Sequence, residues 1–253
     1  MHILSESRMK LKEFVEIRRN LRSFSDFKKY NYPRGLLFSI LSQKIVRKVK
    51  INYERYEKMI DKDSSIIETS EKLGIPPVIV ARIILKKLGF GKKRIRKIIK
   101  NPFLLYNEEI KEKLALANPR IKEEIIAAIA TDFIFSPIAQ EKHRKRGQYA
   151  EEKVKAWLER KKISFIREPE IDSEKTPDFL LNSSFMVNGR EIFWIECKAL
   201  FGDVNEHRYY LERQYRHYLR LFGSGMVVYW YSFLEDIRDI EPKLVIKDRS
   251  FFR

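Results

Sequence analysis

Two stretches decide the fold of this 253-residue chain: TPDFLL at residues 176–181 and IFWIECK at residues 192–198. In the first, Pro177-Asp178 opens an apolar run, and a strand tolerates proline at its first position. In the second, Glu196 and Lys198 interrupt an apolar run that reads as a buried strand. Asparagine, serine and glycine between the two runs are turn signals. The stretch therefore predicts an antiparallel hairpin that brings Asp178 and Glu196 together at its open end.

Each half of this pattern has an ordinary alternative. Glu-x-Lys also occurs at four glutamates that read as exposed helix or loop: Glu109, Glu151, Glu159 and Glu241. At Glu196 the alternative is a structural ion pair with a basic neighbour. Pro-Asp is rarer, since only Pro177 among the nine prolines precedes an aspartate. Paired carboxylates suit Mg²⁺, and a lysine beside them can orient a water. The pattern therefore indicates metal-dependent phosphodiester hydrolysis, with Mn²⁺ expected to substitute.

Further segments around the hairpin have the expected periodicity. Residues 206–222 read as an amphipathic helix and residues 226–231 as a hydrophobic strand. The Pro-Asp and Glu-x-Lys motifs resemble those of the PD-(D/E)xK nucleases, which share the core of restriction endonucleases. The stretch from Gly147 to Ile163 looks like the first core helix of that family, and with residues 164–167 as the first strand the order is helix, three strands, helix, strand. The resemblance implies an α+β protein in which a restriction-endonuclease-like α/β domain with an αβββαβ core follows an all-α domain.

The resemblance also implies roles for individual residues. Asp178, Glu196 and the backbone carbonyl of Cys197 would bind Mg²⁺, and Lys198 would position or activate the attacking water. Glu151 matches the glutamate of the family's first core helix, which serves a second metal or its water shell. Gln214 resembles a polar residue of the second helix that contacts phosphate or the lysine. The Cys197 thiol alternates to the opposite face of the strand and is predicted to be packed.

The threonine before Pro-Asp narrows the resemblance to the TPD subgroup. This subgroup includes archaeal proteins and the animal codanin-interacting nuclease. The stretches around residues 176–178, 196–198, 222–225 and 229–231 are all similar to it. The resemblance covers residues 147–235 most firmly and implies a deoxyribonuclease that selects DNA by its structure.

Charge is divided unevenly along the chain. Residues 1–146 contain 34 Lys and Arg against 17 Asp and Glu, whereas residues 147–253 contain 18 of each. A net charge of +17 confined to one part indicates a nucleic-acid partner, here DNA. A breaker and a charge run at residues 136–146 mark the predicted boundary. We therefore predict a basic helical DNA-binding domain at residues 1–140 and a nuclease domain at residues 141–253.

A helix-turn-helix-like arrangement precedes the densest basic cluster. Residues 64–74 read as a short helix, and Gly74-Ile75-Pro76-Pro77 as a turn into a second, proline-initiated helix with apolar residues from Val78 to Leu88. Any small helical bundle has similar joints, and the charges can also be ordinary solvated surface. The predicted nucleic-acid-binding residues are Arg82, Lys86, Lys87, Lys92, Lys93, Arg94, Arg96, Lys97, Arg144, Lys145 and Arg146.

Other features exclude some classes of protein and leave others open. No run of 18 apolar residues and no signal sequence occur, which argues against membrane insertion and secretion. One cysteine and four dispersed histidines give neither a disulfide nor a zinc pattern, and they suit the cytoplasm, or the nucleus in a eukaryote. A non-catalytic DNA-binding or scaffold protein of the same fold is the alternative function. RNA as substrate, a homodimer and a protein partner also stay open.

Overall fold

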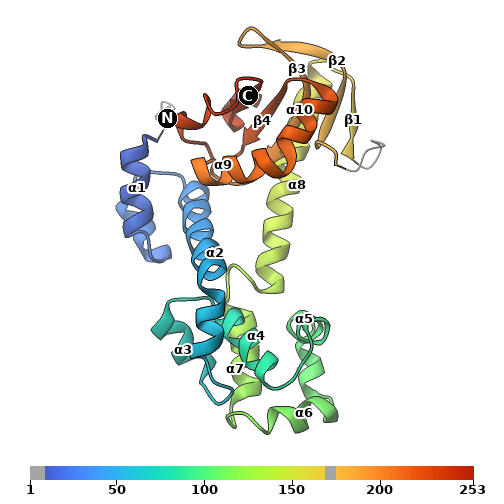
Figure 1. Ribbon diagram of the computed structural model, residues 1–253. Helices are drawn as coiled ribbons and strands as arrows, with labels where there is room; N and C mark the ends of the chain where they lie inside the picture. The colour runs from blue at the N-terminus through green and yellow to red at the C-terminus, as the bar shows by residue number, and fades with distance from the viewer. Residues whose placement is uncertain (1–8, 169–174) are drawn as a thin grey trace. The chain divides into compact units, whose positions relative to one another are not determined.

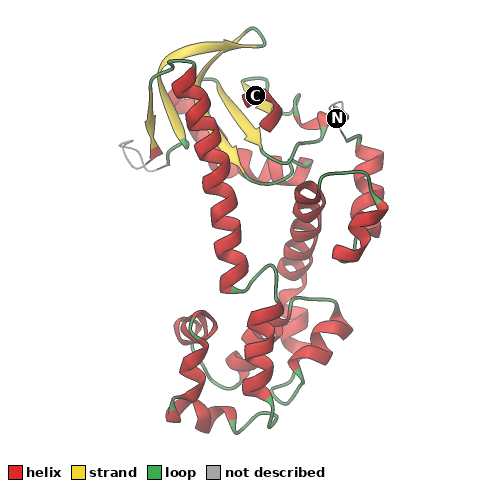
Figure 2. Cartoon of the chain, turned by 180° about the vertical axis from the view of Figure 1, so that it is seen from behind, coloured by secondary structure: helices red, strands yellow, loops and turns green. Residues whose placement is uncertain are grey.

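The computed structural model describes residues 9–168 and 175–253 (Figures 1 and 2). These residues fall into two units. Residues 42–144 form the helical unit, and residues 9–41 with the described part of 145–253 form the sheet unit. Two long helices contribute residues to both units: α2, Arg34–Met59, and α8, Pro137–Arg160.

The helical unit is built around α4, Pro77–Lys87. A proline begins this helix, at a position where the missing N–H costs nothing. Seven of its eleven residues are buried: Val78, Ile79, Val80, Ala81, Ile83, Ile84 and Leu85. A helix that is apolar around its whole circumference lies inside a core. Around it are α3 (Ile66–Leu73), α5 (Lys92–Lys100), η2 (Pro102–Tyr106), α6 (Glu108–Leu114) and α7 (Ile121–Thr131).

The joint between α3 and α4 follows from local chemistry. The Ser65 hydroxyl caps α3 by accepting the Glu68 N–H at 3.4 Å. Gly74 ends the helix in the left-handed conformation, at φ +57°, which glycine adopts without steric cost. Helix, glycine turn and helix are thus present where the sequence predicts them.

The sheet unit contains five strands in the order of the chain: β1 (Phe165–Arg167), β2 (Phe179–Val187), β3 (Arg190–Lys198), β4 (Gly225–Tyr229) and β5 (Leu244–Lys247). The first three strands pair antiparallel, and β3, β4 and β5 pair parallel. Asn188 and Gly189 close the β2–β3 hairpin, both with positive φ as a tight hairpin turn requires. The predicted α+β class and the hairpin are confirmed.

Helices cover both faces of this sheet. On one face α8 packs Ala150, Val154 and Leu158 against strand residues that include Cys197. On the other lie α9 (Val204–Tyr210), the π-helical turn η4 (Leu211–Tyr215) and α10 (Arg216–Phe222). Trp194 of β3 packs edge-on against Tyr218 of α10, with ring centroids 5.2 Å apart. Figure 1 shows α10 in front of the sheet, and Figure 2, from behind, shows α8 in front of it. The observed order is the predicted one: helix, three strands, helix, strand.

The N-terminal helices belong to the sheet unit. These are α1, Leu11–Asn20, and the 3₁₀ helix η1, Phe24–Lys29. Phe14 stacks on Phe201 at 5.5 Å between ring centroids, and Arg18 pairs with Asp203 at 3.5 Å. The Ser39 hydroxyl accepts the Phe201 N–H at 2.7 Å. These contacts join residues 9–41 to the segment after β3, so the observed division differs from the predicted one at residue 140.

Three further features differ from expectation. The charged stretch at residues 142–146, predicted as a boundary, lies inside α8, because lysine and arginine are good helix formers and the helix tolerates the single glycine that follows them, Gly147. The apolar pattern of residues 34–49 predicts a helix there, and α2 continues beyond that range to Met59. Strand β5 was not predicted. In the described parts of the chain, no helix is both long and apolar enough to cross a membrane.

Candidate active site

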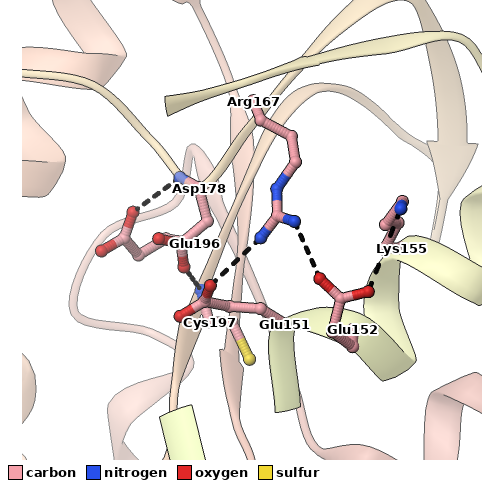
Figure 3. A network of polar contacts seen from close by, with 7 residues as sticks. All are labelled: Glu151, Glu152, Lys155, Arg167, Asp178, Glu196 and Cys197. Atoms are coloured by element: carbon pink, nitrogen blue, oxygen red, sulfur yellow. Dashed lines mark hydrogen bonds and ion pairs between the residues drawn. The ribbon is translucent and has the colours of Figure 1, made fainter. Parts of the chain in front are cut away.

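The ends of β2 and β3 bring Asp178 and Glu196 together. The register pairs Phe179 with Ile195, so the residues next to them, Asp178 and Glu196, lie side by side. The Asp178 N–H donates to Glu196 Oε2 at 3.3 Å, and the Cys197 N–H donates to Asp178 Oδ2 at 2.7 Å (Figure 3). Each carboxylate is therefore held by the backbone of the opposite strand.

Both carboxylates resist ionisation in this arrangement. Glu196 is 3% exposed and Asp178 is partly exposed. Burial, and then the charge of Glu196, raise the pKa of Asp178 well above its usual value. Burial likewise raises the pKa of Glu196, although Lys198 opposes this. Two neighbouring carboxylates with raised pKa values form a site that a cation would stabilise.

Lys198 supplies the positive charge of the site. It projects from the same face of β3 as Glu196, two residues away, and hydrogen-bonds to Glu196 Oε1. Its Nζ lies 4.6 Å from the ring centroid of Tyr210. Burial alone would lower the pKa of Lys198, but the charge and hydrogen bond of Glu196 raise it above its usual value. Lys198 is therefore an ammonium that donates hydrogen bonds, rather than a free base.

The Cys197 side chain points away from these groups. It is buried against α8, and burial raises the pKa of its thiol well above the usual value, so a thiolate nucleophile is disfavoured. The backbone of Cys197, in contrast to its side chain, lies next to the Asp178 carboxylate. Its N–H points to Asp178, and a strand residue directs its N–H and C=O to the same side. The Cys197 carbonyl therefore points to the side on which Asp178 lies.

Glu151 approaches this group from α8 but is held by an arginine. Arg167 Nη2 lies 3.2 Å from Glu151 Oε2, and Arg167 Nη1 lies 2.8 Å from Glu152 Oε1 (Figure 3). The guanidinium also lies 5.5 Å from the ring centroid of Phe179, which follows Asp178. Sequence reasoning missed Arg167. The one available signal was a basic residue at the end of the predicted strand 164–167.

Gln214 lies in the π-helical turn η4, an irregularity often found at functional sites. Its Oε1 is buried and has no hydrogen-bond partner among the described residues. No hydrogen bond joins it to Lys198 in the described structure. Nearby, Tyr218 donates its hydroxyl to the Thr176 carbonyl at 2.7 Å, which anchors the Thr-Pro-Asp segment to α10.

The donors present suit a hard cation with few protein ligands. Within residues 9–168 and 175–253 no group of three or more His, Cys, Asp or Glu side chains is arranged to hold a metal ion. Mg²⁺ is commonly held by one or two carboxylates together with water and substrate phosphate. Asp178, Glu196 and the Cys197 carbonyl match that requirement, whereas the Glu151 carboxylate is paired with Arg167.

The predicted nucleic-acid-binding residues lie on three helices, α4, α5 and α8. On α4, Lys86 pairs with Glu57, Lys87 lies 3.5 Å from Asp61, and Arg82 donates to the Phe135 carbonyl at 3.4 Å. Most of α4 is buried, and its exposed basic residues, Lys86 and Lys87, lie at its C-terminal end. The basic residues of α5 are mostly exposed.

Two of the three predicted residues of α8, Arg144 and Arg146, contact other side chains of the protein. Arg144 pairs with Glu141 at 2.6 Å. The Arg146 guanidinium lies 4.3 Å from the ring centroid of Phe38. Lys145 lies between them on the same helix.

Comparison with known proteins gives one family. The family described as "Protein of unknown function TPD sequence-motif" matches residues 117–250. A Mus musculus protein named CDAN1-interacting nuclease 1 is 30% identical over 207 residues, which cover 79% of this chain and 72% of the relative. Proteins of the same name are similar at 27% in Homo sapiens (73% and 66% covered) and 25% in Danio rerio (85% and 77% covered). No solved structure matches the chain.

Proposed function

Because the chain belongs to the family defined by the TPD sequence motif, we propose that it is a metal-dependent nuclease that hydrolyses phosphodiester bonds in DNA. The observation that carries the proposal is the pair of carboxylates at the ends of β2 and β3, each held by the other strand's backbone. The relatives' printed name, nuclease, supports the same class of reaction. We further assign the sheet unit to the PD-(D/E)xK nucleases, with an element order that supports this assignment.

Asp178, Glu196 and the Cys197 carbonyl would hold Mg²⁺ in this scheme. The ion, when bound, would neutralise charge on the scissile phosphate and make a water more acidic. Lys198, as an ammonium, would donate a hydrogen bond to the attacking water or to a phosphate oxygen and orient it. Glu196 would keep Lys198 in place through their ion pair.

Arg167, Glu151 and Gln214 would surround this centre. The Arg167 guanidinium is already ordered by two carboxylates, and its flat fork of donors suits a phosphate. We assign it to a non-bridging phosphate oxygen. Glu151 would then be free to bind the water shell of the metal. The unpartnered Oε1 of Gln214 would accept a hydrogen bond that forms only when substrate is present.

Cleavage assays test the proposal. Labelled single-stranded, duplex, splayed, flap and four-way-junction DNA would be incubated with Mg²⁺, Mn²⁺ or EDTA. We expect metal-dependent cutting by the wild type, and a loss of at least about a hundredfold in Asp178→Asn and Lys198→Ala, because each removes a group that contacts the reacting atoms. Glu191→Gln is the matched control, since Glu191 lies on the same strand at its exposed start. Cutting by Asp178→Asn at the wild-type rate would refute the assignment.

A non-catalytic role is the second candidate. Among the described residues no three-member metal cluster exists, and Lys198 occupies one oxygen of Glu196. These observations favour a protein that binds DNA or a protein partner without cutting. The relatives' name also supports a protein partner. Binding of every DNA without cleavage under any metal would favour this candidate.

A further inference from the structure

The helix α5 exposes a face made only of basic side chains. Its sequence, KKRIRKIIK, buries three isoleucines, Ile95, Ile98 and Ile99, on the inner side. Five basic residues are exposed on the remaining surface: Lys92, Lys93, Arg96, Lys97 and Lys100. In the described structure none of these five is part of an ion pair, and only Arg94 of this helix is paired, with Glu109 at 3.5 Å.

This face is unfavourable for the protein by itself. Like charges four residues apart on a helix repel, and here they stand at Lys92 and Arg96, Lys93 and Lys97, and Arg96 and Lys100. The first turn contains no acidic residue, so the two lysines there oppose the positive end of the helix dipole. The charge of Arg96 also contributes to lowering the pKa of Arg82, after burial. A polyanion bound to the face would relieve each of these repulsions.

The neighbouring helix α4 differs from α5 in that its lysines have acidic partners, although the basic residues of the two helices are close in sequence. The groups on α4 are satisfied within the protein, as Lys86 is by Glu57 and Lys87 by Asp61. The two helices therefore provide a matched comparison of paired lysines, Lys86 and Lys87, with unpaired lysines, Lys93 and Lys97, six to eleven residues away in the chain.

We infer that the exposed basic face of α5 is the surface through which the helical unit binds the phosphate backbone of DNA, an inference that rests on the proposed function. It narrows the predicted set of nucleic-acid-binding residues, which covers α4, α5 and α8, to the exposed residues of α5. The side chains are lysine and arginine on one face of a short helix, with no acceptor or amide among the exposed five. Such a face contacts phosphates and gives affinity without selecting a sequence.

DNA binding in EDTA tests the inference, using the full chain with Asp178→Asn so that cleavage cannot interfere. Fluorescence anisotropy would be measured with two duplexes of unrelated sequence across a range of salt concentrations. Adding Lys93→Gln and Lys97→Gln should weaken binding about tenfold at 0.15 M salt and flatten the salt slope by about 2, equally on both duplexes. Adding Lys86→Gln and Lys87→Gln removes the same charge from α4 and should change affinity less than about twofold, because these lysines already have protein partners.

Three outcomes would overturn the inference. They are an unchanged affinity in the α5 variant, an equal loss in the α4 variant, and tighter binding of an RNA duplex than of DNA. Thermal unfolding controls for folding, since relief of repulsion should leave the α5 variant at least as stable as its parent. Lys93→Arg with Lys97→Arg should keep full affinity. Because binding is read without metal, a failure of the nuclease proposal would show only in the cleavage assay.

Discussion

At the scale of single residues, Lys198 contributes both to the stability of the fold and to the chemistry proposed for the site. Its ammonium is the positive partner of Glu196, whose pKa burial raises. Lys198→Met should destabilise the fold by about 2 kcal/mol at pH 8, since one partner of a buried pair is removed. Without the ammonium, the pKa of Glu196 should rise further, so the folded protein loses stability as pH rises above the unfolded value of about 4.5.

Chemical denaturation of wild type and variant at pH 5 and pH 8 measures this effect. The difference in unfolding free energy should be larger at pH 8. Lys243→Met is the control, because the Lys243 side chain is exposed and should give little change at either pH. A penalty that stays equal at both values would contradict the ion-pair explanation.

His207 gives a second prediction for a single residue. It is fully buried, its Nδ1 lies 3.0 Å from the Tyr229 hydroxyl, and burial lowers its pKa to about 4. In the unfolded chain this histidine has a pKa of about 6.5. Between pH 6.5 and 4 the unfolded chain therefore binds more protons at His207 than the folded chain does. The contribution of His207 to stability should therefore be fully present above pH 6.5 and fall by about 3 kcal/mol as pH drops to 4.

Urea unfolding between pH 7.5 and 4 checks the prediction. His207→Gln should be less stable at pH 7.5 but should show a shallower pH dependence, because the titrating group is gone. An unchanged slope in this variant would assign the pH dependence to other groups.

The sequence predicts the carboxylate pair better than its surroundings. Asp178 and Glu196 could be paired in advance because the turn signals and alternation define a hairpin register. Arg167 could not be found, since its position next to Glu151 depends on how a three-residue strand pairs with β2. The unpartnered Oε1 of Gln214 depends on a π-helical turn that regular helical periodicity does not reveal.

At the scale of elements, the contact between β3 and β4 depends on one glycine. Trp194 pairs with Gly225 across the parallel ladder, and a Cβ on Gly225 would lie 2.0 Å from the indole. Trp194 is fully buried, so the ring has no free space into which it can move. Gly225→Ala should therefore destabilise the protein by about 2–3 kcal/mol through overpacking.

Thermal unfolding of Gly225→Ala measures this cost. Gly189→Ala tests a different mechanism in the same sheet, since nothing lies within 4 Å of its Cβ position and only its φ of +75° opposes alanine. We expect a smaller loss, about 1 kcal/mol, at Gly189. Wild-type stability of Gly225→Ala would mean that the Trp194 ring moves aside.

Elements with strong periodicity were predictable, whereas their ends and short strands were not. The hairpin, α3, α4 and the helix order around the sheet follow from apolar patterns and turn residues. The strand β5 has four residues, too few for a pattern to stand out. The burial of seven α4 residues could not be read from its sequence, because the burial of a helix depends on the neighbours that pack around it.

At the scale of the whole molecule, the larger share of the net positive charge and the carboxylate pair lie in different units. The helical unit, residues 42–144, has 23 Lys and Arg against 13 Asp and Glu, a net of +10. The carboxylate pair lies in the sheet unit. The charge counts predict that all the excess positive charge lies ahead of the catalytic part, whereas residues 9–41 join the sheet unit through Phe201 and Asp203 and bring part of that charge with them.

This separation predicts how binding and cleavage respond to one substitution. In EDTA, Asp178→Asn should bind DNA as tightly as the wild type or a few-fold more tightly, because it removes a negative charge near the expected phosphate position. The salt slope should stay the same, since it counts the lysines and arginines that neutralise phosphates and Asp178 is not one of them. Anisotropy titrations of both proteins at about 50, 100 and 200 mM salt give the comparison. Binding through phosphate contacts changes strongly over roughly this range of salt concentration. A tenfold loss of affinity in Asp178→Asn would mean that the site itself supplies the main grip on DNA, and the charge of the helical unit would then need another explanation.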